Sequence, residues 1–431
     1  MNNVYIFIIF FLFLTTKIVS QPNIESFAPA YGPIGTEVII AGSNFSPNAI
    51  DNIVYFGATK AVVTAASSTS LNVIVPFGAT YQPITVLVAS EGLLNYSRKP
   101  FRVTFDGPQN FDANTLVHKG IFGGASTAAF GDLDNDGKVD LIVINRIPPS
   151  NTITLSVLRN ISTGAGSIRF AERVDFQIEF RPRMILVGDL DGDGKLDLAT
   201  INSYNRNSIF VFRNTSGGIG DINFAEKDEF STGSDPRSGF IGDLDRDGKA
   251  DLVVTNNNEN SISYLRNTSS GHGIINFGDK VDFATDLNPH YISICDLDGD
   301  YRDDLIFRND VDLISVLQSN QDGETLNFSP KIDFKSDQLI RSVTLGDFDG
   351  DEKIDFLTGN QVFHNITNPD NNIPGHSLIN FENVANLNTG ENPAVGDFNG
   401  DGKLDIAIVN NKSFTLLQNT SEINNINFDS K

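Results

Sequence analysis

The chain has 431 residues, with 31 Lys and Arg against 54 Asp and Glu, which gives a formal net charge of −23. So acidic a surface repels phosphate backbones, and no basic cluster offsets it, which argues against nucleic-acid binding. The single cysteine permits neither an internal disulfide nor a cysteine-based zinc site, and the five histidines form no HExxH pattern. With 40% hydrophobic residues the chain can bury a core, and its length allows two or three domains.

The N-terminus has the pattern of an export signal. Residues 1–20 contain one apolar run, from Val4 to about Leu14, which is too short to cross a bilayer. Ser20 suits a peptidase that cuts before Gln21, although no Lys or Arg precedes the run. We expect a signal peptide at 1–20, an uncleaved anchor being the alternative. The chain is then secreted or held at the cell surface, with no transmembrane segment.

Residues 21–105 have the pattern of a small two-sheet β-sandwich. Segments rich in β-branched residues, separated by Gly and Pro, predict strands at 37–42, 52–57, 71–76 and 83–88. Short motifs follow one another in this segment in the order Pro22-x-Ile24, Phe27-x-Pro29, Gly32-Pro33-x-Gly35-Thr36, Gly42-x-x-Phe45, Val54-x-Phe56-Gly57 and Val75-Pro76. This order of motifs closely resembles that of the IPT/TIG family. The resemblance implies an immunoglobulin-like domain, which that family uses as a spacer and interaction module.

Residues 106–431 contain a repeat that predicts the architecture. A nine-residue acidic segment recurs six times, starting at Asp132, Asp189, Asp243, Asp296, Asp347 and Asp397. An apolar strand follows each copy and ends near Asn145, Asn202, Asn256, Asn309, Asn360 and Asn410. A third strand follows, and we expect a fourth to begin at Phe170, Phe224, Phe277, Phe328, Phe381 and Phe428. About four strands per 50–57 residues, with no helical period, predict an all-β chain in which a β-propeller follows the sandwich.

The number of blades depends on an early segment. Phe111–Val117 has the pattern of a further fourth strand, and we expect it to close the last blade, which gives six blades. A seven-bladed ring, or a fragment of a longer parent, is the open alternative.

The repeated acidic residues have the spacing of a cation-binding loop. Carboxylates at positions 1, 3 and 5 converge when the backbone curls, position 6 needs a positive φ, position 7 offers its carbonyl, and position 9 closes the site. Position 1 is Asp132, Asp189, Asp243, Asp296, Asp347 and Asp397; position 3 is Asp134, Asp191, Asp245, Asp298, Asp349 and Asn399. Position 5 is Asp136, Asp193, Asp247, Asp300, Asp351 and Asp401; position 7 is Lys138, Lys195, Lys249, Arg302, Lys353 and Lys403. Position 9 is Asp140, Asp197, Asp251, Asp304, Asp355 and Asp405.

Charge favours a bound cation over simple Asp-Gly turns. Five loops have four aligned carboxylates each and the sixth has three, so 23 of the 54 acidic residues occupy these aligned positions. Such clusters repel strongly without a counter-ion, and flexible all-oxygen sites suit Ca²⁺. We therefore predict up to six Ca²⁺ ions and expect the position-7 side chains to point to solvent. Tyr301 and Glu352 replace glycine at position 6, so the fourth and fifth loops should bind more weakly.

The loops differ from EF-hands, since position 12 supplies no carboxylate and no helices flank them. Their strand–loop–strand setting and repeat length resemble the FG-GAP/VCBS repeats of the integrin α-subunit propeller family, over about residues 106–431. The resemblance implies one Ca²⁺ per loop, between the first and second strands of each blade.

The remaining signals have simpler interpretations. Some Asn-x-Ser/Thr segments recur at the end of the third strand, beginning at Asn160, Asn214, Asn267, Asn365 and Asn419; they are glycosylation sequons in form, but their recurrence there favours turns. We expect the histidines to be surface or loop residues and Cys295 to be a small buried residue where other copies have glycine.

Together these features predict a secreted, non-enzymatic, calcium-binding propeller that acts in adhesion or binds an extracellular protein or glycan. The sandwich would hold it away from a surface or contribute to recognition. The alternatives are an extracellular propeller enzyme acting on glycans and a purely structural surface-layer component.

Overall fold

The computed structural model describes residues 20–104, 127–147, 152–163, 168–179, 182–203, 206–285, 288–310, 313–320, 325–336, 340, 342–358, 361–368, 379–387, 391–410 and 413–430. The expected signal peptide, apart from Ser20, and the early Phe111–Val117 segment lie outside these residues. In the described part of the chain, no helix is long and apolar enough to cross a membrane.

The N-terminal module is one folded-over sheet of seven antiparallel strands. Its order is β1-β3-β6-β5-β4-β7-β8. The strands are β1 (Asn23–Ala28), β3 (Glu37–Ser43), β4 (Asn52–Phe56), β5 (Thr59–Ala66), β6 (Ser70–Ile74), β7 (Pro83–Val88) and β8 (Leu93–Pro100). A short parallel pair, β2 (Tyr31–Gly32) with β9 (Arg102–Val103), and a 3-10 turn, η1 (Ala49–Asp51), complete the module. All four strands that the sequence predicts are confirmed. The two layers are continuous through β4 and β5, rather than two separate sheets.

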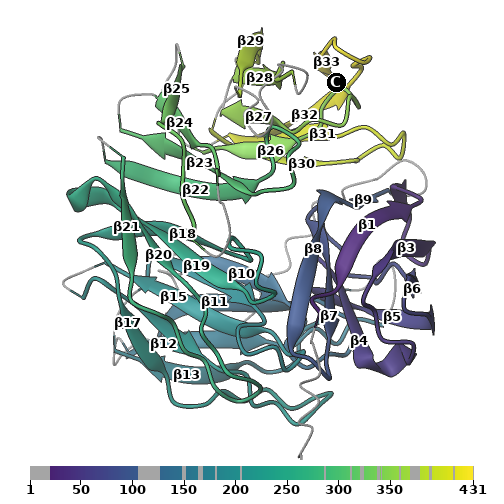
Figure 1. The fold of residues 1–431 in the computed structure, drawn as a ribbon, viewed down its shortest axis with the longest axis vertical. Coiled ribbons are helices and arrows are strands. Elements are labelled where there is room, and N and C mark those ends of the chain that lie inside the picture. Colours follow the sequence, from purple (N-terminus) through teal and green to yellow (C-terminus); the bar gives the residue numbers. More distant parts are fainter. Residues whose placement is uncertain are drawn as a thin grey trace, which may run out of the picture.

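Six four-stranded antiparallel sheets follow, each built from one continuous stretch of chain (Figure 1). Blades 1 and 2 comprise β10 (Ala128–Gly131), β11 (Asp140–Ile147), β12 (Thr152–Leu158), β13 (Val174–Ile178), and β14 (Met184–Gly188), β15 (Asp197–Asn202), β16 (Ser208–Phe212), β17 (Asp228–Ser231). Blade 3 comprises β18 (Pro236–Gly242), β19 (Asp251–Asn256), β20 (Ser261–Leu265) and β21 (Val281–Ala284), and a 3-10 turn, η2 (Asn257–Glu259), follows β19. Blade 4 comprises β22 (Pro289–Cys295), β23 (Asp304–Asn309), β24 (Leu313–Leu317) and β25 (Ile332–Lys335). Blades 5 and 6 comprise β26 (Thr344–Gly346), β27 (Asp355–Thr358), β28 (Gln361–Asn365), β29 (Phe381–Asn386), and β30 (Glu391–Gly396), β31 (Asp405–Asn410), β32 (Ser413–Asn419), β33 (Phe428–Ser430).

These six sheets are blades of the predicted propeller, so the all-β fold class is confirmed. The described residues form six blades and no seventh sheet, in line with the preferred interpretation. In blade 6 the fourth strand is β33, from the same repeat; the early segment that we expected to close this blade lies outside the described residues.

The fourth strands begin later than the sequence analysis placed them in blades 1 to 4. There Phe170, Phe224, Phe277 and Phe328 form isolated bridges to the end of the third strand, and the fourth strand starts four residues further on. The reason is that these rings pack between blades. Phe224 lies edge-on to Phe176 of the preceding blade, with ring centroids 5.0 Å apart. The same arrangement recurs at Phe230–Phe277 and Phe283–Phe328. In blades 5 and 6 the strands do begin at Phe381 and Phe428.

The sandwich packs against the blades instead of standing apart as a spacer (Figure 1). In β4, Val54 and Phe56 face the sandwich's own core, whereas Ile53 and Tyr55 belong to the core of blades 1 to 3. Alternation along a strand therefore gives β4 two buried faces. Leu87 and Leu94 join the same shared core. Apolar burial thus stabilises the two modules as one unit.

Candidate functional site

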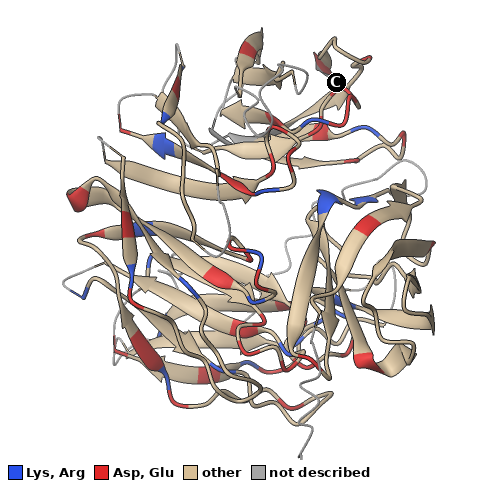
Figure 2. Cartoon of the chain, in the orientation of Figure 1, with Lys and Arg blue, Asp and Glu red and all other residues tan. Residues whose placement is uncertain are grey.

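All six acidic loops connect the first and second strands of their blades. The first strand ends immediately before position 1, and the Asp at position 9 is the first residue of the second strand in every blade. This confirms the setting that the repeat spacing predicts. Figure 2 shows that the acidic turns lie at the blade ends that face the sandwich.

The backbone of each loop curls around the carboxylate at position 1. The N–H of position 6 donates to that carboxylate in all six loops, over 2.8–3.2 Å. Position 6 has φ between 73° and 86° throughout, and Tyr301 and Glu352 adopt this conformation like the four glycines. Position 4 also has a positive φ in every loop, as at Asn135 and Arg246. The sequence analysis missed this second left-handed residue, although position 4 is glycine in four loops, at Gly192, Gly299, Gly350 and Gly400.

The Asp at position 9 acts as a clamp. One of its oxygens accepts the N–H of position 2, over 2.8–3.1 Å. The other accepts, over 2.7–2.8 Å, the N–H of the last third-strand residue in blades 5 and 6 and of the residue two positions beyond that strand in blades 1 to 4. Position 9 therefore fixes the loop to the third strand of its own blade.

In every blade but the fourth, where it is Ser319, this residue is the asparagine of a recurring sequon. The side chain of Asn267 donates to the carbonyls of Ala250 in its own blade and Leu190 in the preceding blade, both at 2.8 Å. Asn214, Asn365 and Asn419 repeat this pair of bonds. These four side chains are at most 1% exposed. Their amide nitrogens are thus engaged inside the protein, which supports the turn interpretation over glycosylation.

The loops bring carboxylates together as the spacing predicts, with variation in which ones meet. Positions 1, 3 and 5 offer ligand atoms within 4.8 Å of one another in loops 1 and 4, and positions 1, 3 and 9 do so in loops 2 and 3. In loop 5 the described group is Asp349, Asp351 and His364. Asn399 of the sixth loop hydrogen-bonds with Asp401. Several buried clusters therefore have the chemistry to hold metal ions.

Burial perturbs these carboxyl groups strongly. It raises the pKa of Asp132 and Asp140 to about 7, and neighbouring carboxylates add to the shift while backbone hydrogen bonds oppose it. Burial likewise raises the pKa of Asp189, Asp251 and Asp355 to about 8. A cation within the loop would offset the unfavourable burial of negative charge.

The surroundings of one carboxylate oxygen in the third loop show whether that loop fits a cation. Asp243 Oδ1 is buried and has no hydrogen-bond partner, although Asp243 Oδ2 accepts the N–H of Gly248 at 3.0 Å. A buried carboxylate oxygen without a donor is costly. A hard cation is the partner that such an oxygen accepts most readily. The third loop therefore fits a calcium-type ion.

The side chains at position 7 differ from expectation. Lys138, Lys195 and Lys353 do not extend into solvent but lie 3.3–3.5 Å from the carboxylate at position 5 of the same loop, and Arg302 pairs with Asp300. The attraction between adjacent opposite charges explains this folding back. The carbonyl contribution of position 7 stays a prediction.

The sandwich bonds to loops 1 to 5 and lies beside loop 6. Backbone and side-chain bonds join Ala58 O to loop 1, Tyr55 Oη to Gly194 O of loop 2 at 2.7 Å, and Leu94 N to Gly248 O of loop 3 at 2.8 Å. Arg98 pairs with Asp296 of loop 4 over 2.9 Å, and the hydroxyl of Tyr81 accepts from the N–H of Asp347 in loop 5. In loop 6, a Cβ at Gly402 would lie 3.5 Å from the ring of Tyr31.

The two loops without glycine at position 6 use those side chains to contact the sandwich. Arg98 lies over the Tyr301 ring, 4.4 Å from its centroid, and Lys99 pairs with Glu352 over 2.8 Å. The strained positions therefore have a docking role that the loop pattern alone did not indicate.

His364 and Cys295 were expected to be a surface or loop residue and a small buried residue, respectively. His364 is instead buried on β28, beside the fifth loop, at 6% exposure. Cys295 ends β22 and is half-buried, and burial raises its pKa well above the usual range. That thiol is therefore a poor nucleophile.

Comparisons with known proteins agree with this architecture. The FG-GAP-like repeat model matches residues 132–200, 189–254, 243–307 and 296–358, the FG-GAP repeat model matches 389–413, and the IPT/TIG domain model matches 22–105. No curated protein matches the chain.

Solved structures give distant likenesses. An auxiliary nutrient binding protein from Bacteroides ovatus is 16% identical, with 90% of this chain and 95% of that chain covered and a TM-score of 0.36. The periplasmic gluconolactonase PpgL of Pseudomonas aeruginosa is 12% identical, with 88% and 95% covered and a TM-score of 0.48. Neither likeness carries an argument about activity. The FG-GAP-like matches together run from 132 to 358, more than half of the chain, and the chain belongs to the FG-GAP-like repeat family, with an IPT/TIG domain at its N-terminus.

Proposed function

We propose that this protein is a secreted or cell-surface calcium-binding propeller that binds an extracellular partner, as adhesion modules do, and catalyses no reaction. The observation that carries the proposal is the convergence of buried aspartates in the loops, with ligand atoms within 4.8 Å of one another. The all-oxygen donor sets of loops 1 to 4 suit Ca²⁺, which accepts six to eight oxygens at flexible angles.

Calcium would act mainly on the structure of the loop face. Each loop is clamped to its own third strand, and four of the clamping asparagines also bond to the preceding blade. Since the sandwich covers these same loops, an ion in a loop would stabilise both the junction between blades and the docking of the sandwich. Bound ions would thus provide the stabilisation that disulfides give to many secreted proteins and that a chain with one cysteine cannot form internally.

The described side chains support a non-enzymatic role. The loop aspartates are committed to backbone hydrogen bonds and to one another. His272 bonds to the carbonyl of Ala89, and His290 pairs with Asp310. Among the described residues, neither histidine is bonded to a serine, threonine or cysteine that it would activate. An extracellular partner, protein or glycan, would therefore be bound and not converted.

Calcium binding can be tested by titration calorimetry on the metal-depleted chain. We expect several Ca²⁺ ions per chain, with Mg²⁺ binding much more weakly. Asp191→Asn in loop 2, at a position within the converging group, should remove or weaken one site at least tenfold. Asp228→Asn, an exposed change in β17, should match the wild type. Wild-type protein that takes up no Ca²⁺, or an Asp191→Asn variant identical to the control, would contradict the proposal.

A further inference from the structure

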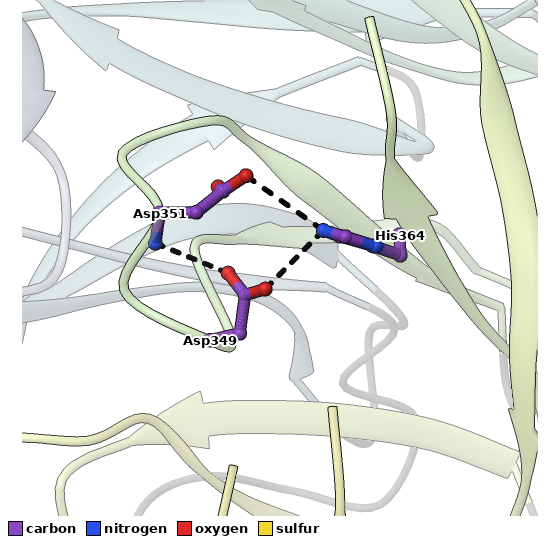
Figure 3. Close-up of side chains that lie close together, drawn as sticks. All are labelled: Asp349, Asp351 and His364. Atoms are coloured by element: carbon purple, nitrogen blue, oxygen red, sulfur yellow. Dashed lines mark hydrogen bonds and ion pairs between the residues drawn. The ribbon is translucent and has the colours of Figure 1, made fainter. Parts of the chain in front are cut away.

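A histidine lies beside the fifth loop, where the corresponding residues of the other blades are arginine or glutamine. His364 lies on β28, one residue before the clamping Asn365, and its imidazole points into the loop (Figure 3). Nε2 lies 3.2 Å from Asp349 Oδ2 and 3.7 Å from Asp351 Oδ2. The residue is 94% buried, since its exposure is 6%, and Nε2 makes no hydrogen bond within the described part of the chain.

Blades 1, 3 and 4 show what usually occupies this place. There the residue just before the one bonded to the position-9 carboxylate has a side chain whose N–H groups approach the carboxylate at position 3. Arg159 lies 3.7 Å from Asp134, Arg266 pairs with Asp245, and Gln318 donates to Asp298 over 2.6 Å. A guanidinium or amide nitrogen has no lone pair to give to a metal. An imidazole nitrogen does, so blade 5 replaces a donor by a ligand.

The geometry fits a shared ion between these three side chains. Two ligand atoms that each lie about 2.1 Å from a tetrahedral ion are about 3.4 Å apart. The distances of 3.2 and 3.7 Å from Nε2 to the two carboxylate oxygens lie on either side of this value. A lone pair facing two carboxylates is repulsive without a cation or proton between them, and burial excludes the water that would screen it.

We propose that the fifth loop is a mixed imidazole–carboxylate site for a first-row transition-metal dication such as Zn²⁺, formed by His364, Asp349 and Asp351. Nitrogen ligands suit Zn²⁺ and its neighbours in the series, whereas Ca²⁺ prefers oxygen alone. The site does not require that the other loops bind calcium. Asp349 Oδ2 also accepts the N–H of Asn424 in blade 6, at 2.6 Å, so the ion would tie the fifth blade to the sixth.

The test is Zn²⁺ titration of the full chain with Ca²⁺ held in large excess, and Co²⁺ visible absorption as a second readout. We expect one tight Zn²⁺ per chain and a Co²⁺ spectrum with nitrogen ligation. His364→Gln restores the donor found at Gln318 and should fold normally, yet weaken Zn²⁺ binding at least tenfold. His290→Gln removes a histidine outside the loops and should leave Zn²⁺ binding unchanged.

A gain-of-site variant keeps the test independent of any folding defect. Gln318→His places an imidazole beside Asp298 and Asp300 and should add a second Zn²⁺ equivalent. The proposal is overturned if the wild type binds no Zn²⁺ against excess Ca²⁺, or if His364→Gln binds it as tightly as the wild type. If the wild type binds Zn²⁺ but takes up no Ca²⁺, the proposed function is refuted and the zinc site is not.

Discussion

Asn267, the clamping asparagine just after the third strand of blade 3, should be a large contributor to the stability of the blade junction. Asn267 is 1% exposed and its side chain makes three bonds: Nδ2 donates to Leu190 O and Ala250 O, and Oδ1 accepts from Ser269 N at 2.9 Å. Asn267→Ala removes all three at once. It leaves the backbone N–H of residue 267 free to keep its bond to the position-9 carboxylate of Asp251.

The size of the effect follows from these bonds. Each buried hydrogen bond contributes about 1 kcal/mol net, and an orphaned buried partner costs more, so the loss should be about 3 kcal/mol. Unfolding entropy near 2.1 cal/mol/K per residue, for a unit of roughly 300 residues, converts this into a fall in Tm of about 5 °C.

The assay is calorimetric melting at saturating Ca²⁺, so that metal occupancy is held constant. Asn276→Ala is the matched control, since Asn276 is an exposed asparagine of the same blade. It should change stability by less than about 0.5 kcal/mol. Asn267→Ser, which copies Ser319 of blade 4, should fall between the two. If Asn267→Ala melts with the control, the assignment of these asparagines as inter-blade clamps is wrong.

Three further outcomes are expected. Burial raises the pKa of Asp132 to about 7 and of Asp189 to about 8, so the metal-free folded chain binds more protons than the unfolded chain. The urea midpoint of the metal-free chain should therefore fall as pH rises from about 4 to about 8. Excess Ca²⁺ should abolish this fall. A midpoint in EDTA that rises with pH over that window would contradict the burial of these groups. Tyr55→Phe deletes the bond to Gly194 O and should lower the free energy of unfolding by about 1–2 kcal/mol, measured by urea denaturation; no change would mean that the hydroxyl does not support docking. Glu352→Gly relieves a positive φ of 75° at the cost of one exposed ion pair, and should stabilise the protein by up to about 1 kcal/mol in the same assay, whereas a clear loss would show that Lys99 matters more than strain.

Regular repetition made much of the fold predictable. The spacing of the acidic segments placed six loops between first and second strands, and a third strand follows in each blade as predicted. The positive φ at position 6 followed from the need to curl the loop, and it holds even at Tyr301. Features shared by every repeat can be recognised in a single sequence, because the six repeats show the same residue pattern at the same positions.

Contacts between distant segments were not predictable in the same way. The pattern of β4 identified a strand but not that Ile53 and Tyr55 would be covered by blades 1 to 3. Likewise Phe224 was read as the start of a strand, although its ring packs against Phe176 of the preceding blade. Periodicity shows which residues are apolar, but not which neighbour buries them.

His364 was missed for a related reason. The five histidines share no repeat position, so the sequence analysis treated them together as loop or surface residues. Aligning the residue before each clamping asparagine would have placed His364 beside Arg159, Arg266 and Gln318, and thus next to the loop. The informative signal was a departure from the repeat, not the repeat itself.

The central claim is that calcium in the loops stabilises the propeller and its docked sandwich. Its most direct test is calorimetric melting of the chain in excess EDTA and then in about 1 mM Ca²⁺, with Mg²⁺ as control. A site with a Kd near 10 μM contributes about 2.7 kcal/mol at that concentration. Several such sites should raise the transition markedly, and the sandwich should shift with the blades because they share one core. Transitions that coincide in EDTA and in Ca²⁺ would show that the acidic loops are structural turns and would contradict the account.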